Sequence, residues 1–353
     1  MATVSKKLFG TTKKGEDIYI FTLINNSNMT VELMNYGATI ISIKVPDKNN
    51  KITDVLLGYG ELSKYENQDK YLGATIGRCA NRIENAEITI NNKKYKLNKN
   101  DNNNHLHGGI EGFDKKVWNF EITENNDVKF FYTSPDMEEN YPGELKTCVT
   151  YSIENETNTL KISYNATSNK DTICNLTNHS YFNLDGYNSG SVLDQYVQIL
   201  ADYFTQNTKA SVPDGKICSV KNTPLDFRIP KKIGQDIKSN FEQIKFANGF
   251  DNNWVINNYD KTIKKAACAY SLKSGIKLEV STDLPGIQFY SGNYLGGDEK
   301  VLGKSETAID KRCGFCLECQ FFPNAFKYEH FEKPVLKANE IYNKTILYSF
   351  SLV

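Results

Sequence analysis

The chain has 353 residues, of which 39% are hydrophobic and 12% aromatic, so it can bury a sizeable core and does not belong to the disordered class. Its 42 basic and 42 acidic side chains cancel, which leaves no charge field to attract nucleic acid or an anionic membrane. No uninterrupted apolar run is long enough to span a bilayer. We therefore expect neither nucleic acid nor a membrane as a partner.

The cysteines and the N-terminal segment favour a cytoplasmic location with reduced thiols. The eight cysteines lie mostly in apolar segments and lack the spacing of a small disulfide-bonded scaffold. The first ten residues contain no apolar stretch of signal-peptide length. The glycosylation sequons that begin at Asn175 and Asn178 fall inside a candidate site, described below, which glycans would block.

Short segments with β character recur along the whole chain and are separated by turns rich in Gly, Asn, Asp and Pro. Helical periodicity is scarce, and its best candidate, residues 231–246, is interrupted by Gly234. Many strands without a βαβ rhythm predict an all-β antiparallel sandwich or barrel. No linker or repeat divides the chain, so we predict one domain over residues 1–353. The predicted strands are, in chain order, residues 17–23, 39–45, 87–90, 128–133, 147–153, 159–164, 192–200, 276–281, 287–290, 315–322 and 342–349.

The first segment with unusual chemistry is Tyr-Leu-Gly-Ala-Thr-Ile-Gly-Arg-Cys-Ala-Asn-Arg-Ile, residues 71–83. Its Gly-x-x-x-Gly is not a phosphate loop, because the Gly-Lys-Ser/Thr ending is missing and no βαβ unit surrounds it. Taken alone, Asn81 and Arg82 would be surface residues more often than ligand contacts.

The second segment, residues 104–115, contains His105 and His107 ahead of a Gly-Gly pair. A His-x-His sequence on a strand places both imidazoles on one face, where they can bind a metal. No other His or carboxylate cluster nearby completes a ligand set, and the Gly-Gly reads as a tight turn. We therefore expect no metal site, with one functional histidine and one incidental one.

The most informative stretch is Asn-Leu-Thr-Asn-His-Ser-Tyr-Phe-Asn-Leu, residues 175–184. If it is a strand, its alternation puts His179 on a polar face with Asn, Thr and Tyr side chains, opposite Leu and Phe. Such faces usually meet water, but this set also suits a polyhydroxylated ligand with many donors and acceptors. This segment alone leaves both interpretations open.

Glu318 lies in the apolar segment 314–322, between Cys316 and Cys319. A surface glutamate and a functional one are about equally expected there, and a half-buried carboxylate would have a raised pKa and suit a general base. Alternation places Cys316 opposite Cys313 and Cys319, so three thiolates cannot converge on a metal. Further polar segments are Gly249 to Trp254, with Asp251, and Pro285 to Asn293, with Gln288.

Together, these segments resemble the aldose 1-epimerase (galactose mutarotase) family in sequence and in order. The resemblance runs from about Asn35 to the C-terminal Tyr-Ser-Phe, nearly the whole chain. The motifs that carry it are Gly-Ala-Thr-Ile-Gly-Arg-Cys-Ala-Asn-Arg-Ile (73–83), Leu-His-Gly-Gly (106–109) with Gly-Phe-Asp-Lys (112–115), Asn-Leu-Thr-Asn-His-Ser-Tyr-Phe-Asn-Leu (175–184), Gly-Phe-Asp (249–251), Pro-Gly-Ile-Gln-Phe-Tyr-Ser-Gly-Asn (285–293) and Gly-Phe-Cys-Leu-Glu-Cys-Gln (314–320).

The resemblance implies a large antiparallel β-sandwich with a hexose in a cleft over one sheet, and no cofactor or metal. By position, Glu318 matches the general base of the family, His179 the general acid and His107 the second catalytic histidine. Positions that hold sugar hydroxyls are matched by Asn81, Arg82, Asp251 and Gln288. The chain departs from the family at Asn252, where His is frequent, and at Trp254, where Phe is usual, so we expect a change in pocket detail.

The implied reaction removes the proton of the C1 hydroxyl while the ring oxygen is protonated, so that the ring opens, the C1–C2 bond rotates and the ring recloses. A carboxylate and an imidazolium on opposite sides of the anomeric centre suffice for this chemistry. The imidazolium has to be charged near neutral pH, so we expect a neighbouring carboxylate to keep the pKa of His179 from falling.

Two other functions fit parts of the pattern. In a glycoside hydrolase, Asp251 and Glu318 would form the carboxylate pair. A non-catalytic sugar-binding protein would be expected to lose Glu318 or His179, and both are present. A hexose-6-phosphate epimerase would need a basic phosphate clamp, which the sequence does not reveal. The sequence does not rank galactose against glucose, and we expect a monomer or a weak homodimer.

Overall fold

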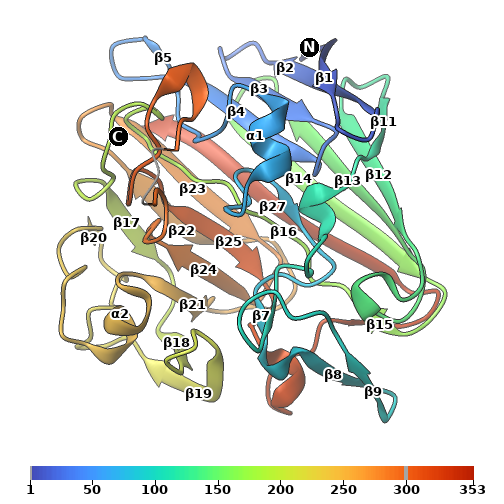
Figure 1. Ribbon diagram of the computed structural model, residues 1–353. Helices are drawn as coiled ribbons and strands as arrows, with labels where there is room; N and C mark the ends of the chain where they lie inside the picture. Colours follow the sequence, from blue (N-terminus) through green and yellow to red (C-terminus); the bar gives the residue numbers. More distant parts are fainter. Residues whose placement is uncertain (1, 298–300) are drawn as a thin grey trace.

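Strands dominate the fold, which the computed structural model describes for residues 2–297 and 301–353 (Figure 1). Within these ranges the two α-helices are α1 (Leu62–Asn67) and α2 (Glu242–Ala247), each of six residues, and neither is long and apolar enough to cross a membrane. Short 3₁₀ turns are η1 (Glu84–Ala86), η2 (Phe113–Lys115), η3 (Glu138–Asn140), η4 (Lys304–Glu306) and η5 (Ala325–Lys327).

One layer of the fold is a nine-stranded antiparallel sheet, counted over the described residues. Its strands alternate between buried and more exposed residues, as in β23, because successive side chains point to opposite faces of a sheet. In spatial order they are β11 (Asn119–Ile122), β12 (Val128–Ser134), β13 (Leu145–Ile153), β14 (Asn158–Ser168), β27 (Ile341–Leu352), β23 (Ile276–Thr282), β22 (Lys264–Tyr270), β17 (Tyr196–Ile199) and β20 (Lys231–Lys232).

The opposite layer consists of two five-stranded antiparallel sheets, again within the described ranges. The N-terminal sheet contains β1 (Thr3–Thr11), β2 (Asp17–Ile24), β3 (Thr30–Met34), β4 (Thr39–Pro46) and β5 (Ile52–Asp54). The second sheet, which we call the site sheet, contains β19 (Pro213–Ser219), β18 (Tyr203–Asn207), β21 (Asp251–Val255), β24 (Gly286–Tyr290) and β25 (Cys316–Gln320).

The main hydrophobic core lies between the two layers and contains side chains from all three large sheets. Phe21 of β2 packs against Phe130 of β12, with ring centroids 5.4 Å apart, and Phe182 packs against Tyr348 of β27 at 5.2 Å. Burying such an aromatic side chain stabilises the fold by about 1.5–3 kcal/mol. The fold is therefore the predicted all-β antiparallel sandwich, and its nine-stranded layer crosses behind the site sheet in Figure 1.

Short two-stranded pairs connect the irregular segments at one end of the site sheet. They are β6 (Thr75–Ile76) with β16 (Thr177–Asn178), β7 (Arg82–Ile83) with β10 (His105–Leu106), β8 (Glu87–Ile90) with β9 (Lys93–Lys96), and β15 (Thr172–Ile173) with β26 (Val335–Leu336). They hold loops, not long strands, over the sheet.

Two sequence-based element predictions were wrong. The best candidate for a helix, 231–246, is mostly β20 and turns, because Lys232 pairs with Tyr196 of β17, and only α2 at its end is helical. The strand predicted over 175–184 is reduced to β16, because its backbone pairs with several separate segments. All ten of its residues are buried, so its polar side chains meet protein groups or a cavity, not bulk water.

Candidate functional site

The site sheet has one face toward the core and one toward the candidate site. Leu317 and Phe289 pair across β25 and β24 and belong to the main core. Glu318 follows Leu317, and Gln288 precedes Phe289. These two residues also pair with each other, and their side chains point to the face opposite the core. Strand alternation thus places a carboxylate on the non-core face of a strand in which all five residues are buried.

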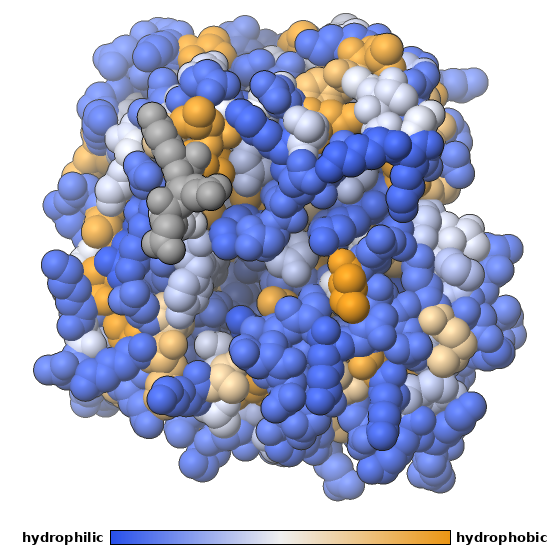
Figure 2. Space-filling model, viewed as in Figure 1, coloured by the Kyte–Doolittle hydropathy of each residue, from blue (hydrophilic) through white to orange (hydrophobic). Residues whose placement is uncertain are grey.

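Loops from the two-stranded pairs close a cavity of about 150 Å³ over this face. In Figure 2 the same face of the molecule is mainly hydrophilic and is hollowed near its centre. The lining residues are Asp69, Lys70, Tyr71, Asn81, Arg82, Leu106, His107, His179, Tyr181, Asp251, Tyr290, Tyr294 and Glu318.

Glu318 and His179 face each other inside the cavity. Nε2 of His179 lies 3.6 Å from Oε2 of Glu318, and both side chains are almost completely buried. On the other side of the imidazole, Nδ1 lies 3.5 Å from the sulfur of Cys316. The ring is stacked between Tyr71 and Tyr181, with centroids 5.8 and 5.0 Å away. The two groups thus lie side by side on one wall of the cavity.

Burial shifts the pKa values of this pair in opposite directions. Burial, and then the charge of Asp251, raise the pKa of Glu318 well above its usual value, while Arg82 acts to lower it. Burial lowers the pKa of His179 to about 4. The expectation that a neighbouring carboxylate keeps this pKa from falling was therefore wrong, because the carboxylate is itself desolvated. Burial thus favours the uncharged form of both groups.

The two histidines of the His-x-His sequence do not share a face, contrary to the prediction. His107 has a left-handed backbone with φ of 51°, which ends the strand alternation after Leu106. His105 instead points into the protein, where its Nδ1 lies 2.7 Å from the carbonyl of Asn98 and its Nε2 lies 2.5 Å from the hydroxyl of Tyr141. His105 is thus the incidental, structural histidine, and His107 is the one that lines the cavity.

The hydrogen bond to His107 determines which nitrogen carries its proton. The backbone N–H of Asn81 donates to Nδ1 of His107 over 3.2 Å, so Nδ1 is an acceptor. Burial and the neighbouring positive charges lower the pKa of His107 well below its usual value, which keeps the ring neutral. The single ring proton of a neutral imidazole then lies on Nε2. His107 therefore presents a hydrogen-bond donor.

This tautomer also bears on metal binding. Within the described residues, His107, His179 and Glu318 offer ligand atoms that lie within 4.8 Å of one another. A metal at Nε2 of His107 would require the proton to move to Nδ1, where it would meet the N–H of Asn81. The donor set thus fits a metal poorly.

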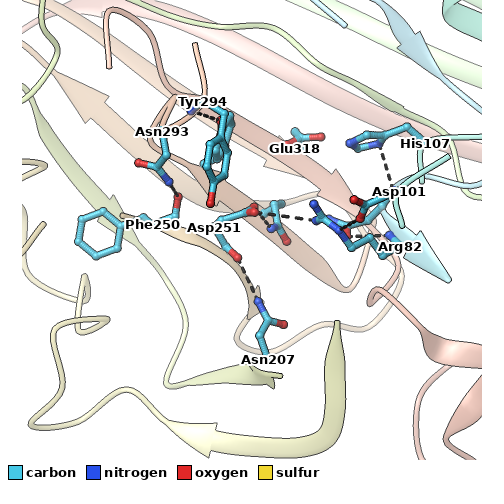
Figure 3. Close-up of polar contacts among 12 residues, drawn as sticks. Arg82, Asp101, His107, Asn207, Phe250, Asp251, Asn293, Tyr294 and Glu318 are labelled. Atoms are coloured by element: carbon cyan, nitrogen blue, oxygen red, sulfur yellow. Dashed lines mark hydrogen bonds and ion pairs between the residues drawn. The ribbon is translucent and has the colours of Figure 1, made fainter. Parts of the chain in front are cut away.

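An ion-pair network forms a second wall of the cavity (Figure 3). Nε of Arg82 donates to Asp101 over 2.6 Å, and its Nη1 lies 3.9 Å from the carboxylate of Asp251. Burial acts to lower the pKa of Arg82, but Asp251 and Asp101 outweigh it and raise that pKa. Gln288 donates to Asp251 over 2.7 Å and does not line the cavity, so it supports Asp251 from behind.

The three clustered cysteines do not meet at a common centre, as predicted. The position of Cys313 differs from the prediction. Cys319 belongs to the main core, whereas Cys316 faces His179, as strand alternation requires. Cys313 packs in the same apolar cluster as Cys316, not opposite to it, because the chain turns before β25 begins.

The two departures from the family pattern lie behind the site sheet. Asn252 alternates away from Asp251 and donates to Oε1 of Gln243 over 3.0 Å. Trp254 is completely buried and donates to the carbonyl of Leu225 over 3.1 Å. Neither residue lines the cavity, so the expected change in pocket detail is not found at its surface.

Comparisons with known proteins agree with this geometry. A family model described as aldose 1-epimerase matches residues 19–349. Galactose mutarotase of Sus scrofa is 39% identical over 354 residues, covering 100% of both chains. Aldose 1-epimerase of Escherichia coli (strain K12) is 35% identical over 338 residues, covering 95% of this chain and 96% of its own. The chain belongs to the aldose 1-epimerase family.

The structure of galactose 1-epimerase from Lactobacillus acidophilus superposes with a TM-score of 0.87 at 29% identity, covering 100% of this chain and 99% of that one. Family membership explains why the motif residues converge. We inferred family membership from six motifs, and three further residues of the site lie outside those motifs. Asp101, which holds Arg82 but does not line the cavity, lies in an Asn-rich stretch that reads as a loop, and the lining residues Tyr71 and Tyr294 read as ordinary aromatics.

Proposed function

We propose that the protein is an aldose 1-epimerase that interconverts the α and β anomers of D-hexopyranoses such as galactose and glucose. The observation that carries the proposal is the contact between the buried side chains of His179 and Glu318, 3.6 Å apart in the cavity that the motif residues line. The C1 hydroxyl oxygen and the ring oxygen are both bonded to C1. An acid and a base that lie side by side can therefore reach both atoms at once.

In the proposed mechanism, Glu318 takes the proton of the C1 hydroxyl while His179 protonates the ring oxygen. The ring opens to the aldehyde, the C1–C2 bond rotates, and the same two groups work in reverse to reclose it. The Nε2–H of His107 donates to the oxygen on which charge develops. Each positioned acid or base contributes about 10²–10⁴-fold to the rate.

The shifted pKa values suit this cycle. A neutral imidazole with a protonated carboxyl group holds one proton in total, and so does an imidazolium with a carboxylate. The reactive form therefore arises by moving one proton within the site, without exchange with solvent. Binding of the sugar supplies the hydroxyl groups that stabilise the charged form.

The second wall of the cavity binds the sugar in this proposal. Asn81, Arg82 and Asp251 contact sugar hydroxyls, and Gln288 acts through Asp251. Tyr71 and Tyr294 add aromatic surface for the apolar face of the ring. A hexose is thus the expected partner, and no cofactor or metal takes part.

The alternatives fit the geometry less well. In a glycoside hydrolase Asp251 would work opposite Glu318, but its carboxylate is engaged by Gln288 and Arg82. A sugar-binding protein would not need His179 and Glu318 paired as acid and base, 3.6 Å apart.

A hexose-6-phosphate epimerase needs a free cation to hold the phosphate group. The cations that line the described cavity are Lys70 and Arg82, and each is already paired with a carboxylate, Asp69 at 3.1 Å and Asp101 at 2.6 Å. An unphosphorylated hexose is therefore the proposed substrate.

We also propose that the protein is cytoplasmic. The side chains of Asn175 and Asn178 are at most 1% exposed, so the folded protein offers no room for a glycan at either sequon. A monomer or weak homodimer, without nucleic-acid or membrane partners, and a single domain over residues 1–353 stay predictions.

Polarimetry tests the proposed function. Freshly dissolved α-D-galactose and α-D-glucose should reach their equilibrium rotation much faster with the purified protein than without it, and equally fast after treatment with a chelator. Release of sugar from a glycoside without acceleration of mutarotation would favour the hydrolase. Loss of activity with the chelator and recovery with zinc would refute the metal-free mechanism.

A further inference from the structure

A groove of about 520 Å³ lies beside α2 and shares no residue with the sugar cavity. Four of its nine lining residues are positively charged, and none of these nine described residues carries a carboxylate. The whole chain has a net charge of zero, so this concentration does not follow from a basic composition. The lining residues are Ile237, Lys238, Ser239, Asn240, Ile244, Lys245, Asn248, Lys311 and Arg312.

The charges in the groove differ from those of the neighbouring lysines. Lys231 and Lys232, a few residues earlier, are paired with Asp236 at 2.7 Å and Asp194 at 2.9 Å. Among the described residues, no carboxylate lies within ion-pair distance of any of the four groove cations. An anion that enters the groove therefore does not have to displace a carboxylate.

Arg312 is the most constrained of the four cations. Its Nη2 donates to the carbonyl of Asn248 over 2.6 Å, and its backbone N–H donates to the carbonyl of Gly292 over 2.9 Å. Its Nε is buried and has no hydrogen-bond partner among the described residues. Burial without a neutralising carboxylate lowers the pKa of Arg312. A buried donor without a partner destabilises the folded protein, and an anionic acceptor would offset that cost.

We propose that this groove binds a small phosphorylated metabolite through its phosphate groups. Guanidinium and ammonium groups form strong charge-assisted hydrogen bonds to phosphate oxygens, and Ser239, Asn240 and Asn248 add uncharged donors. The volume lies in the range of small-molecule sites. The class of ligand is a phosphate monoester or a diphosphate, bound independently of the sugar.

Isothermal titration with inorganic pyrophosphate at low salt tests the groove in the full-length protein. The double variant Lys238→Glu/Lys245→Glu should bind pyrophosphate at least about tenfold more weakly than the native protein. Lys14→Glu/Lys221→Glu is the matched control, because both lysines are exposed and the change in net charge is the same. The control should bind like the native protein, and both variants should keep native mutarotation.

Saturating galactose should leave the pyrophosphate affinity unchanged. Displacement by galactose would place the anion in the sugar cavity and overturn the proposal. The same holds for native protein that fails to bind pyrophosphate, or for equal losses in the two double variants. Binding of a nucleic acid without binding of pyrophosphate would also overturn it. Inorganic phosphate and a hexose phosphate, titrated in parallel, separate a free phosphate ligand from a phosphate ester.

Discussion

At the scale of single residues, the site depends on a carboxyl group held where carboxylates are rarely found. Glu318 is 2% exposed, and its Oε2 has no hydrogen-bond partner among the described residues. Leaving such a group unpaired destabilises a protein, so its presence on a buried strand is accounted for by a reaction. Its nearest titratable neighbour, His179, supplies the complementary acid.

Glu318→Gln should therefore reduce kcat by about 10²–10⁴-fold, because the amide keeps the size of the side chain but cannot accept the proton of the C1 hydroxyl. His179→Asn should depress kcat likewise. Sugar affinity, measured by isothermal titration, should change much less, since the second wall of the cavity is intact. Near-normal turnover of a folded, sugar-binding Glu318→Gln variant would place the base elsewhere, with Asp251 the first candidate.

Arg82 should show a different kinetic signature, because it binds the sugar and does not move a proton. Arg82→Ala should raise KM strongly. Asp101→Asn should raise KM about tenfold with a smaller change in kcat, since the charge-assisted bond of 2.6 Å that orients the guanidinium is weakened.

The neighbouring, exposed Asn103 provides the control for that measurement. Steady-state kinetics of Asn103→Ala should match the native protein. A native KM for Asp101→Asn would show that Asp251 alone orients Arg82.

At the scale of elements, the loop after β10 depends on a glycine. Gly108 has φ of +94°, and a Cβ there would lie 1.8 Å from the carbonyl oxygen of Gly77. This close contact holds the loop of His107 against the segment that leads to Asn81 and Arg82. Gly108→Ala should therefore lower both the melting temperature and kcat, because the loop cannot keep its place.

Gly190→Ala separates the two causes of that loss. Gly190 has φ of +84° but no atom within 4 Å of the added Cβ, so this variant carries the backbone strain without the clash. It should lose about 1 kcal/mol of stability and keep its kcat. Equal effects of the two variants on kcat would mean that the contact with Gly77 does not position His107.

The regular strands could be predicted from the sequence, and the loops could not. Segments such as 87–90 and 276–281 alternate in polarity, and the structure has strands there because alternation on a half-buried sheet is a local property. His107 leaves its strand face through a single left-handed residue, and β16 keeps only two residues of a ten-residue pattern. Such features depend on which distant segment pairs with the backbone.

The same distinction applies to the site. Motif resemblance identified the residues that line the cavity, but it attached Gln288 to the sugar, whereas the structure attaches it to Asp251. Resemblance also says nothing about charge state. The low pKa of His179 arises from burial, to which Tyr71 from a distant segment contributes as well as the neighbouring Tyr181, so the local pattern alone could not have indicated it.

At the scale of the whole molecule, burial shifts the pKa values of histidines and of carboxyl groups in opposite directions. Burial lowers the pKa of His105 and His179 to about 4, and that of His107 well below its usual value. Burial raises the pKa of Asp114 to about 7, and also raises those of Asp251 and Glu318.

These two kinds of pKa shift have opposite effects on how the stability of the protein depends on pH. As the pH falls from about 6.5 to 5, the unfolded chain protonates the histidines and the folded protein does not, so stability decreases. In the same window Asp114 holds a proton in the folded protein and not in the unfolded chain, so stability increases. The two effects have opposite signs, so we expect the free energy of unfolding of the native protein to fall less steeply between pH 6.5 and 5 than the histidines alone would cause.

Removing either a histidine or Asp114 should reveal the pH dependence that the remaining groups contribute. His105→Gln lies outside the cavity and removes a group that takes up a proton only on unfolding, so acidification should favour the variant relative to the native protein. Asp114→Asn removes a group that takes up a proton only in the folded state, so acidification should disfavour it. Each difference should grow by up to about 1.4 kcal/mol per pH unit, measured by urea unfolding. Stability curves of His105→Gln and Asp114→Asn that ran parallel to that of the native protein would mean that the two side chains titrate alike in the folded and unfolded states. Burial would then not be what sets their charge.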